Sequence, residues 1–125
     1  MKSSTLVLGA TPNPQRYAFI ATLRLLAAGQ EVELVGIKKG EIGGLSIQQG
    51  QPPLENIDTV TLYVGARHQP AYYDYLLSLK PRRVIFNPGT ENPELMQLLR
   101  ENGIEPVIAC TLVMLASGEY TQHAA

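Results

Sequence analysis

The chain has 125 residues, of which 45% are apolar and 17% charged, and its formal net charge is −1. These values predict one globular domain spanning residues 1–125 and exclude a disordered or fibrous protein. The small net charge argues against nonspecific nucleic-acid binding, and no apolar run approaches the roughly 20 residues that cross a bilayer. One cysteine and two histidines argue against a disulfide framework and a closed zinc site. We therefore expect a cytoplasmic protein without a metal.

The first part of the chain predicts two strands with a helix between them. Thr5–Gly9 and Glu31–Gly36 are short apolar runs rich in β-branched residues, which is typical of buried strands. Gln15–Ala28 carries apolar residues at helical spacing and ends before Gly29, a common helix stop.

The link from Lys38 to Asp58 is rich in glycine and proline. We expect it to be mostly irregular. Within it, a short strand is predicted near Leu45–Ile47 and one helical turn near Leu54–Ile57. Asp58 stands directly before the next strand and is expected to cap or turn the chain.

In the second part, strands again alternate with helices. The predicted elements are a strand at Thr59–Val64, a helix at Gln69–Lys80, a strand at Arg83–Phe86, a helix capped by Asn92 that ends before Gly103, and a strand at Glu105–Ala109. After these, Leu112–Ala116 predicts one apolar helical turn, and residues 118–125 predict a frayed tail.

This alternation predicts an α/β protein, a Rossmann-like three-layer sandwich with a mainly parallel five-stranded sheet. A Rossmann-like strand order is the first choice. A flavodoxin-like order is the second, because the sequence separates the two poorly.

The most informative segment is Leu6–Arg16. Its apolar run stops at Gly9, passes through a small polar loop with two prolines and enters a helix headed by Arg16. Glycine allows the tight turn, loop N–H groups and a helix N-terminus favour an anion, and arginine adds a planar donor fork. The segment lacks the G-x-G-x-x-G of an ordinary dinucleotide-binding loop. It therefore predicts a site for a phosphate-containing ligand.

Ligands of parallel α/β sheets bind outside the carboxyl ends of the strands, so residues just after each strand are candidates. In chain order they are Gly9, Ala10, Thr11, Asn13, Arg16, Lys38, Lys39, Gly65, Arg67, His68, Asn87, Pro88, Gly89, Cys110 and Thr111. Four of these side chains are cationic, which favours an anion site. Arg82 and Arg83 precede the fourth strand at the opposite end and are interpreted as solvated charge.

The end of the second strand argues against NAD. An NAD site normally has an acidic residue there to hold the ribose hydroxyls, whereas this chain has Lys38 and Lys39 and no acid until Glu41. Lysines attract a phosphorylated ribose. The sequence therefore favours a nucleotide-type small molecule with an additional phosphate.

Two residues raise the question of catalysis. Cys110 offers a thiol, but a lone cysteine at a strand end is more often a small buried hydrophobe. His68 has no nearby acid in the sequence to orient it as a base. We find no paired carboxylates, Ser-His-Asp arrangement or Cys-x-x-Cys. A binding protein is therefore expected. Two alternatives stay open: a small NADP- or acyl-CoA-dependent enzyme using His68 or Cys110, and a ligand-free protein-interaction module.

The run Gly9-Ala10-Thr11-Pro12-Asn13-Pro14-Gln15-Arg16 resembles the opening G-A-S-x-x-P-x-R pattern of the CoA-binding domain family. These small single-domain proteins are related to the CoA-binding domain of the succinyl-CoA synthetase α-subunit. The resemblance covers nearly the whole chain and includes the terminal strand that ends in Cys110. Two positions depart from it: Gly36-Ile37 replaces the family's Asn-Pro, and Phe86-Asn87 followed by Pro88 replaces its aromatic-x-Gln.

The resemblance implies a Rossmann-like fold with coenzyme A as the ligand. It would place the Gly9–Arg16 loop at the CoA pyrophosphate and Lys38 or Lys39 near the nucleotide end. The turn Val64–Arg67 would line the adenine or pantetheine path. The expected CoA contacts are then Gly9, Ala10, Thr11, Asn13, Arg16, Lys38, Lys39, Gly65, Arg67 and Cys110.

Overall fold

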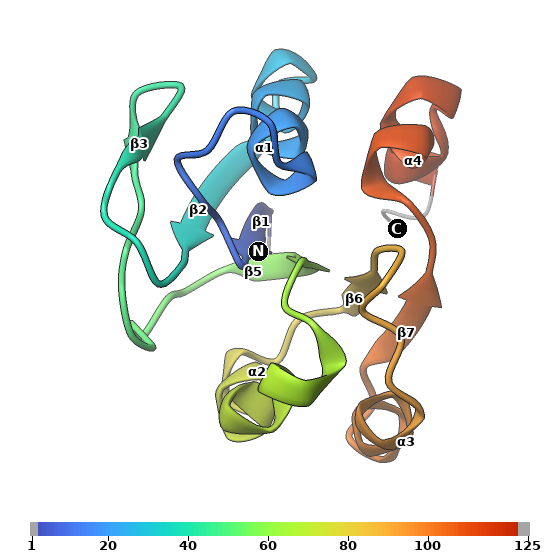
Figure 1. Cartoon of the computed structure of the whole chain (residues 1–125). Coiled ribbons are helices and arrows are strands. Elements are labelled where there is room, and N and C mark those ends of the chain that lie inside the picture. Colours follow the sequence, from blue (N-terminus) through green and yellow to red (C-terminus); the bar gives the residue numbers. More distant parts are fainter. Residues whose placement is uncertain (1–2, 123–125) are drawn as a thin grey trace.

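Five parallel strands form the central sheet of the computed structural model, which describes residues 3–122. They are β1 (Ser4–Leu8), β2 (Glu31–Val35), β5 (Ile57–Leu62), β6 (Arg83–Phe86) and β7 (Glu105–Ile108). Each lies within two residues of its predicted bounds. The predicted α/β, Rossmann-like sandwich with a parallel five-stranded sheet is confirmed (Figure 1).

The strand order depends on one additional bridge beside β2. The five strands run β2-β1-β5-β6-β7, which by itself is the flavodoxin-like order. Val35 also forms a parallel bridge with Gln48, where Gly36 N–H donates to Gln48 O (3.0 Å) and Gln48 N–H donates to Leu34 O (2.9 Å). Counted as a one-residue strand, Gln48 is third along the chain and completes the Rossmann order 3-2-1-4-5-6. The two predicted orders differ here by this bridge alone.

The link between β2 and β5 holds a small hairpin of β3 (Glu41–Ile42) and β4 (Leu45–Ser46). The predicted short strand near Leu45–Ile47 is therefore confirmed. The helical turn predicted near Leu54–Ile57 is wrong. Asn56 has a left-handed backbone (φ 61°), and its carbonyl accepts hydrogen bonds from the N–H groups of Ser3 and Ser4. This pairing leads the chain straight into β5.

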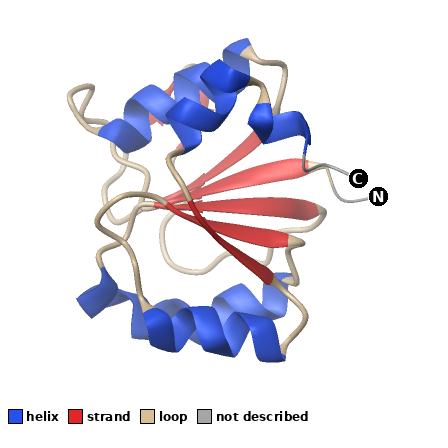
Figure 2. Ribbon diagram, turned by 90° about the vertical axis from the view of Figure 1, so that its right-hand side faces the viewer, coloured by secondary structure: helices blue, strands red, loops and turns tan. Residues whose placement is uncertain are grey.

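Helices cover both faces of the sheet (Figure 2). One layer contains α1 (Tyr17–Ala27), α4 (Thr111–Ser117) and α5 (Glu119–Gln122), and the other contains η1 (Ala66–Tyr72, a 3₁₀ helix), α2 (Tyr73–Leu79) and α3 (Pro93–Glu101). Alternating strand residues fill two cores, as the pleat of a sheet requires. Leu6 and Leu8 pack with the α2–α3 layer, whereas Val7 packs with the α1–α4 layer. No helix within residues 3–122 is long and apolar enough to cross a membrane.

Two of the predicted helices begin differently from each other. Asn92 caps α3 as predicted, because its Oδ1 accepts from Leu95 N–H (3.3 Å) and Pro93 follows in the first turn. The helix predicted at Gln69–Lys80 is instead split, with Pro70 inside the 3₁₀ segment and the α-helix starting at Tyr73.

The predicted frayed tail is wrong for the residues that the structure describes. Gly118 has a left-handed backbone (φ 84°) and turns the chain into α5, where Tyr120 is buried. The Tyr120 hydroxyl is hydrogen-bonded to the Thr5 hydroxyl, which joins α5 to β1. Residues 123–125, including His123, lie outside the described part of the chain.

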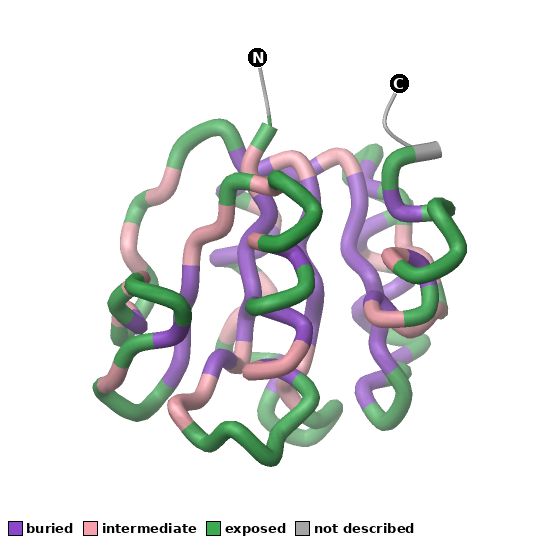
Figure 3. Tube along the Cα trace, turned by 90° about the horizontal axis from the view of Figure 1, so that it is seen from above, coloured by how far each residue is buried: buried purple, intermediate pink, exposed green. Residues whose placement is uncertain are grey.

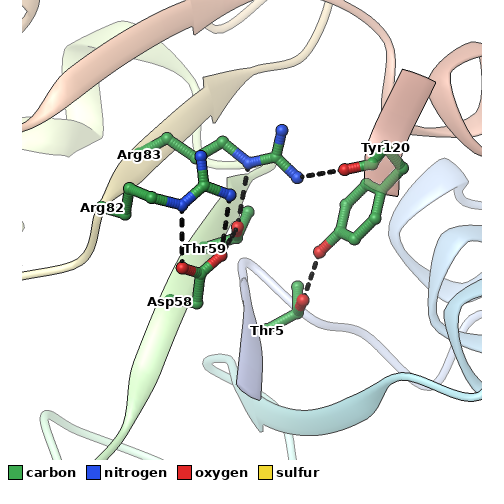
Figure 4. Close-up of polar contacts among 6 residues, drawn as sticks. All are labelled: Thr5, Asp58, Thr59, Arg82, Arg83 and Tyr120. Carbon is green, nitrogen blue, oxygen red and sulfur yellow. Dashed lines mark hydrogen bonds and ion pairs between the residues drawn. The ribbon is translucent and has the colours of Figure 1, made fainter. Parts of the chain in front are cut away.

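Tyr120 covers a buried arginine at the amino edge of the sheet (Figure 4). Arg83 is 1% exposed, its Nε donates to Thr59 Oγ1 (2.9 Å), and its Nη2 donates to Tyr120 O (2.9 Å). The guanidinium carbon lies 4.7 Å from the centre of the Tyr120 ring. The interpretation of Arg83 as solvated charge is therefore wrong. An aromatic face and two acceptors surround this cation instead.

Arg82 forms an ion pair with Asp58. Its Nε lies 2.9 Å from Asp58 Oδ1 and its Nη2 lies 3.1 Å from Oδ2, while Thr59 Oγ1 also donates to Oδ2 (2.8 Å). Burial raises the pKa of Asp58, but these hydrogen bonds and the charge of Arg82 outweigh it and lower the pKa below its usual value. Asp58 therefore joins the start of β5 to the start of β6.

We predict that Asp58→Asn destabilises the protein in a pH-dependent way. A carboxyl whose pKa is lowered on folding stabilises the fold above its unfolded pKa, and that contribution is lost as pH falls through the folded pKa. The variant should lose about 1 kcal/mol at neutral pH, because the pair is partly exposed, and progressively less as the pH falls below the ordinary Asp pKa of 3.8. Urea unfolding at several pH values measures this, with Asp74→Asn at an exposed position of α2 as the control. The same loss of unfolding free energy at neutral and at acidic pH would show that the charge of Asp58 is unimportant.

Candidate functional site

The loop after β1 turns sharply at the point where the strand order reverses. Gly9 has φ +101°, and a Cβ there would lie 2.9 Å from the carbonyl carbon of Tyr63, at the end of β5. The N–H groups of Gly9 and Ala10 both donate to Val35 O, at 2.9 and 3.0 Å. The loop is thus held between the ends of β2 and β5. In α/β sheets the crevice at such a switch point is the usual ligand site.

The same loop packs directly on the segment that follows β2. A Cβ at Gly36 would lie 2.0 Å from Ala10 O, and a Cβ at Gly40 would lie 2.6 Å from Pro12 Cβ. Only glycine allows the two segments this close approach. Gly36 is one of the positions where the sequence departs from the family pattern, and this contact explains the residue found here.

Most N–H groups of the loop already have acceptors. Asn13 N–H donates to Thr11 Oγ1 (3.3 Å), Gln15 N–H donates to Asn13 Oδ1 (3.0 Å), and the two prolines have none. Within residues 3–122, the N–H groups of Thr11 and of the first α1 residues, Tyr17 and Ala18, have no acceptor. An anion at this loop would therefore meet fewer backbone donors than the sequence suggested, and they concentrate at Thr11 and the helix start.

Four cationic side chains stand at this carboxyl edge of the sheet. Arg16 heads α1, Lys38 and Lys39 follow β2, and Arg67 lies on η1 after β5. All four are exposed, and none forms an ion pair with a carboxylate in the described part of the chain. Figure 3 shows buried strands leading to mostly exposed loops at the edge opposite the two termini. The positive charge is therefore open to an incoming anion.

A buried amide, Asn87, organises the other half of this edge. Its Nδ2 donates to Thr61 Oγ1 (2.8 Å) and Leu62 O (3.0 Å), and its Oδ1 accepts from Thr111 N–H (2.9 Å). The backbone oxygen of Asn87 accepts from both the N–H (3.0 Å) and the hydroxyl (2.7 Å) of Thr90. One side chain thus joins the end of β5, the loop after β6 and the start of α4.

Tyr63 directly follows β5, packs against the α1–α4 core and was not singled out from the sequence. Burial raises its pKa to about 12, and the neighbouring Cys110 adds to this, despite hydrogen bonds with Thr61 and Thr111. Cys110 itself is half-buried at the start of α4. Tyr63 therefore stays protonated at neutral pH and acts as a hydrogen-bonding group rather than as a base.

Gln69 is a second buried amide that sequence reasoning missed. Its Nε2 donates to Val64 O and to Thr90 O, both at 2.8 Å, and its Oε1 accepts from Asn92 Nδ2 (2.9 Å). The neighbouring His68 is exposed on η1, and its ring has no hydrogen-bond partner within residues 3–122. A glutamine in a 3₁₀ segment gives no periodic signal, so only the folded loops reveal its role.

Metal ligands and cavities away from the carboxyl edge are the other features of interest among the described residues. Among residues 3–122 no group of three or more His, Cys, Asp or Glu side chains is placed to hold a metal. A polar hollow of about 360 Å³ lies at the opposite, amino edge of β6 and β7. Its lining residues are Leu77, Lys80, Pro81, Arg82, Asn102, Gly103 and Ile104.

Comparison with known proteins agrees with the fold and identifies a matching family. The sequence matches the family model described as the CoA binding domain over residues 3–116. A crystal structure of an uncharacterized protein is 57% identical, with a TM-score of 0.91 over 94% of this chain and 98% of that chain. A conserved hypothetical protein from Pyrococcus furiosus is 25% identical, with a TM-score of 0.77 over 89% of this chain and 97% of that chain.

A structure from Thermus thermophilus is 22% identical, with a TM-score of 0.81 over 93% of this chain and 90% of that chain. At this identity the likeness concerns the fold alone. No curated protein matches the sequence.

We predict that Gly36→Ala disrupts the contact between the two loops. The added methyl group would overlap Ala10 O, so the free energy of unfolding should fall by about 3 kcal/mol. Gly65→Ala is the matched control, because Gly65 has an ordinary backbone (φ −61°) and open space around its Cβ position. Its effect should stay within about 0.5 kcal/mol. Urea unfolding measures both, and equal stability of the two variants would contradict the close approach.

Proposed function

The chain belongs to the CoA binding domain family, and we propose that it binds coenzyme A along the carboxyl edge of its sheet. Membership of this family supports CoA as the ligand. The observation that carries the proposal for this chain is the packing of the Gly9–Arg16 loop on the lysine-bearing segment through Gly36. This contact brings a phosphate-type loop and two cations to one end of the sheet.

The nucleotide end of CoA would lie at β1 and β2. Thr11 N–H, the start of α1 and the Arg16 guanidinium are the donors available for the pyrophosphate. Lys38 and Lys39 would meet the phosphate on the ribose, where an NAD site would instead need an acid. Both features suit a ligand with three phosphate groups rather than two.

The pantetheine arm would continue past Gly65 and Arg67 towards Cys110. Adjacent strands lie about 4.8 Å apart, so the edge from β2 to β7 extends about 19 Å. A ligand with a long arm beyond its pyrophosphate can use this length. A mononucleotide would occupy only the β2–β1 end.

We propose binding without catalysis, in the cytoplasm. Support comes from the side chains at the edge: the exposed His68 ring has no carboxylate partner within residues 3–122, and Tyr63 keeps its proton because burial raises its pKa to about 12. A general base needs an orienting partner and a pKa near the working pH. The side chains described at the carboxyl edge are therefore better suited to contacting a ligand than to transferring protons.

Calorimetry with CoA and with dephospho-CoA tests the proposal. The purified protein should bind CoA with a dissociation constant tighter than about 1 mM and should bind dephospho-CoA more weakly, by about tenfold for the lost charge-assisted contacts. Lys38→Ala with Lys39→Ala should remove this preference. Arg16→Ala should weaken both ligands, because both contain the pyrophosphate.

Arg24→Ala is the control for Arg16→Ala, since Arg24 lies in the last turn of the same helix, at the opposite edge of the sheet. Its affinity for either ligand should equal that of the unaltered protein. CoA binding weaker than millimolar would overturn the proposed function. Equal binding of CoA and dephospho-CoA would remove the role assigned to the lysines.

A further inference from the structure

Three loops at the β5–β7 half of the carboxyl edge are tied together by two buried amide side chains. Asn87 is 1% exposed and Gln69 is 0% exposed. Between them they bond the residues after β5, the turn after β6 and the start of α4. In both side chains the amide nitrogen and the amide oxygen have partners within the described chain.

The Gln69 amide holds the turn after β6, which is closed by a hydrogen bond to the backbone oxygen of Asn87. Gln69 Nε2 donates to Thr90 O (2.8 Å), and the Thr90 hydroxyl donates to Asn87 O (2.7 Å). Gln69 also holds Val64 O (2.8 Å), directly before Gly65. Thus Val64 and Thr90, which belong to separate loops, are held by one side chain. Buried networks that are fully bonded are rigid, and an unpaired buried group within them is costly.

The β2–β1 half of the same edge is built in another way. There the loops are held by backbone hydrogen bonds to Val35 O and by glycine contacts, and the side chains of Arg16, Lys38 and Lys39 project from them exposed. Long cations adapt to a charged group without being fixed in advance. An uncharged, flexible arm gains little from charge, so its binding depends more on loops that are already in place.

From this contrast we infer that Gln69 and Asn87 are positioning residues for the pantetheine arm of CoA, an inference that rests on the proposed function. They hold the turns at Val64–Gly65 and Asn87–Thr90 and the start of α4 at Cys110. These are the loops over which the arm would pass. The nucleotide end of the ligand does not depend on them.

Comparing two ligands separates this role from a merely structural one. Gln69→Met keeps the length of the side chain and removes its hydrogen bonds, which leaves Val64 O and Thr90 O unpaired. The affinity for CoA should fall about tenfold, whereas the affinity for 3′-phosphoadenosine 5′-diphosphate, the nucleotide part of CoA, should change less than about twofold. Calorimetry with both ligands on the full chain measures the ratio of the two dissociation constants.

Gln97→Met is the matched control, because Gln97 is exposed on α3 and bonds only Glu101. The ratio of the two dissociation constants in this control should equal that of the unaltered protein. If Gln69→Met does not fold, Asn87→Leu keeps the approximate side-chain shape, removes the amide bonds to Leu62 O and Thr111 N–H, and should lower the affinity for CoA alone by about tenfold.

The outcomes distinguish this inference from the proposed function. If the unaltered protein binds neither ligand, the proposed function fails. If the unaltered protein binds both, and the variant that folds keeps the same ratio of affinities, Gln69 and Asn87 are structural only and the inference is overturned. An equal loss of affinity for both ligands overturns it as well.

Discussion

The carbonyl oxygen of Ala10 occupies the space where any other residue at position 36 would place its Cβ, 2.0 Å away. This contact sets the geometry of the carboxyl edge. It lets the loop after β1 rest on the segment after β2, while the Gly9 and Ala10 N–H groups share Val35 O. The lysines that follow Gly36 are thereby brought to the same end of the sheet as Arg16. A side chain at position 36 would separate the phosphate-type loop from its cations.

The edge combines two kinds of construction. At β1 and β2, exposed cations stand on loops held by backbone contacts. At β5, β6 and β7, the buried side chains of Asn87 and Gln69 bond the loops to one another. A ligand with a charged end and an uncharged arm matches this division better than one that is charged throughout. The amino edge, where Arg83 and Tyr120 are packed together, serves to hold α5 on the sheet.

Local patterns in the sequence were enough to predict the strands, the Asn92 cap and the turn at Gly9, since each depends on neighbouring residues. Contacts between distant segments were not predictable in this way. Arg83 is buried because Thr59 and Tyr120, which belong to other elements, accept its hydrogen bonds. Residues 119–122 are helical because Tyr120 packs against this arginine. The loop N–H groups were predicted to face a ligand, but several bond Val35 and the loop itself. Gln69 gave no sequence signal at all, because its partners lie on two separate loops.

Amide chemical-shift mapping with added CoA decides whether CoA binds at the carboxyl edge. We expect the largest shifts at Thr11, Tyr17, Ala18 and Lys38, with further shifts at Gly65 and Thr111. The residues at the amino edge around Lys80 and Gly103 should stay unchanged. Shifts confined to that amino edge, or no shifts at millimolar CoA, would contradict CoA binding at the carboxyl edge.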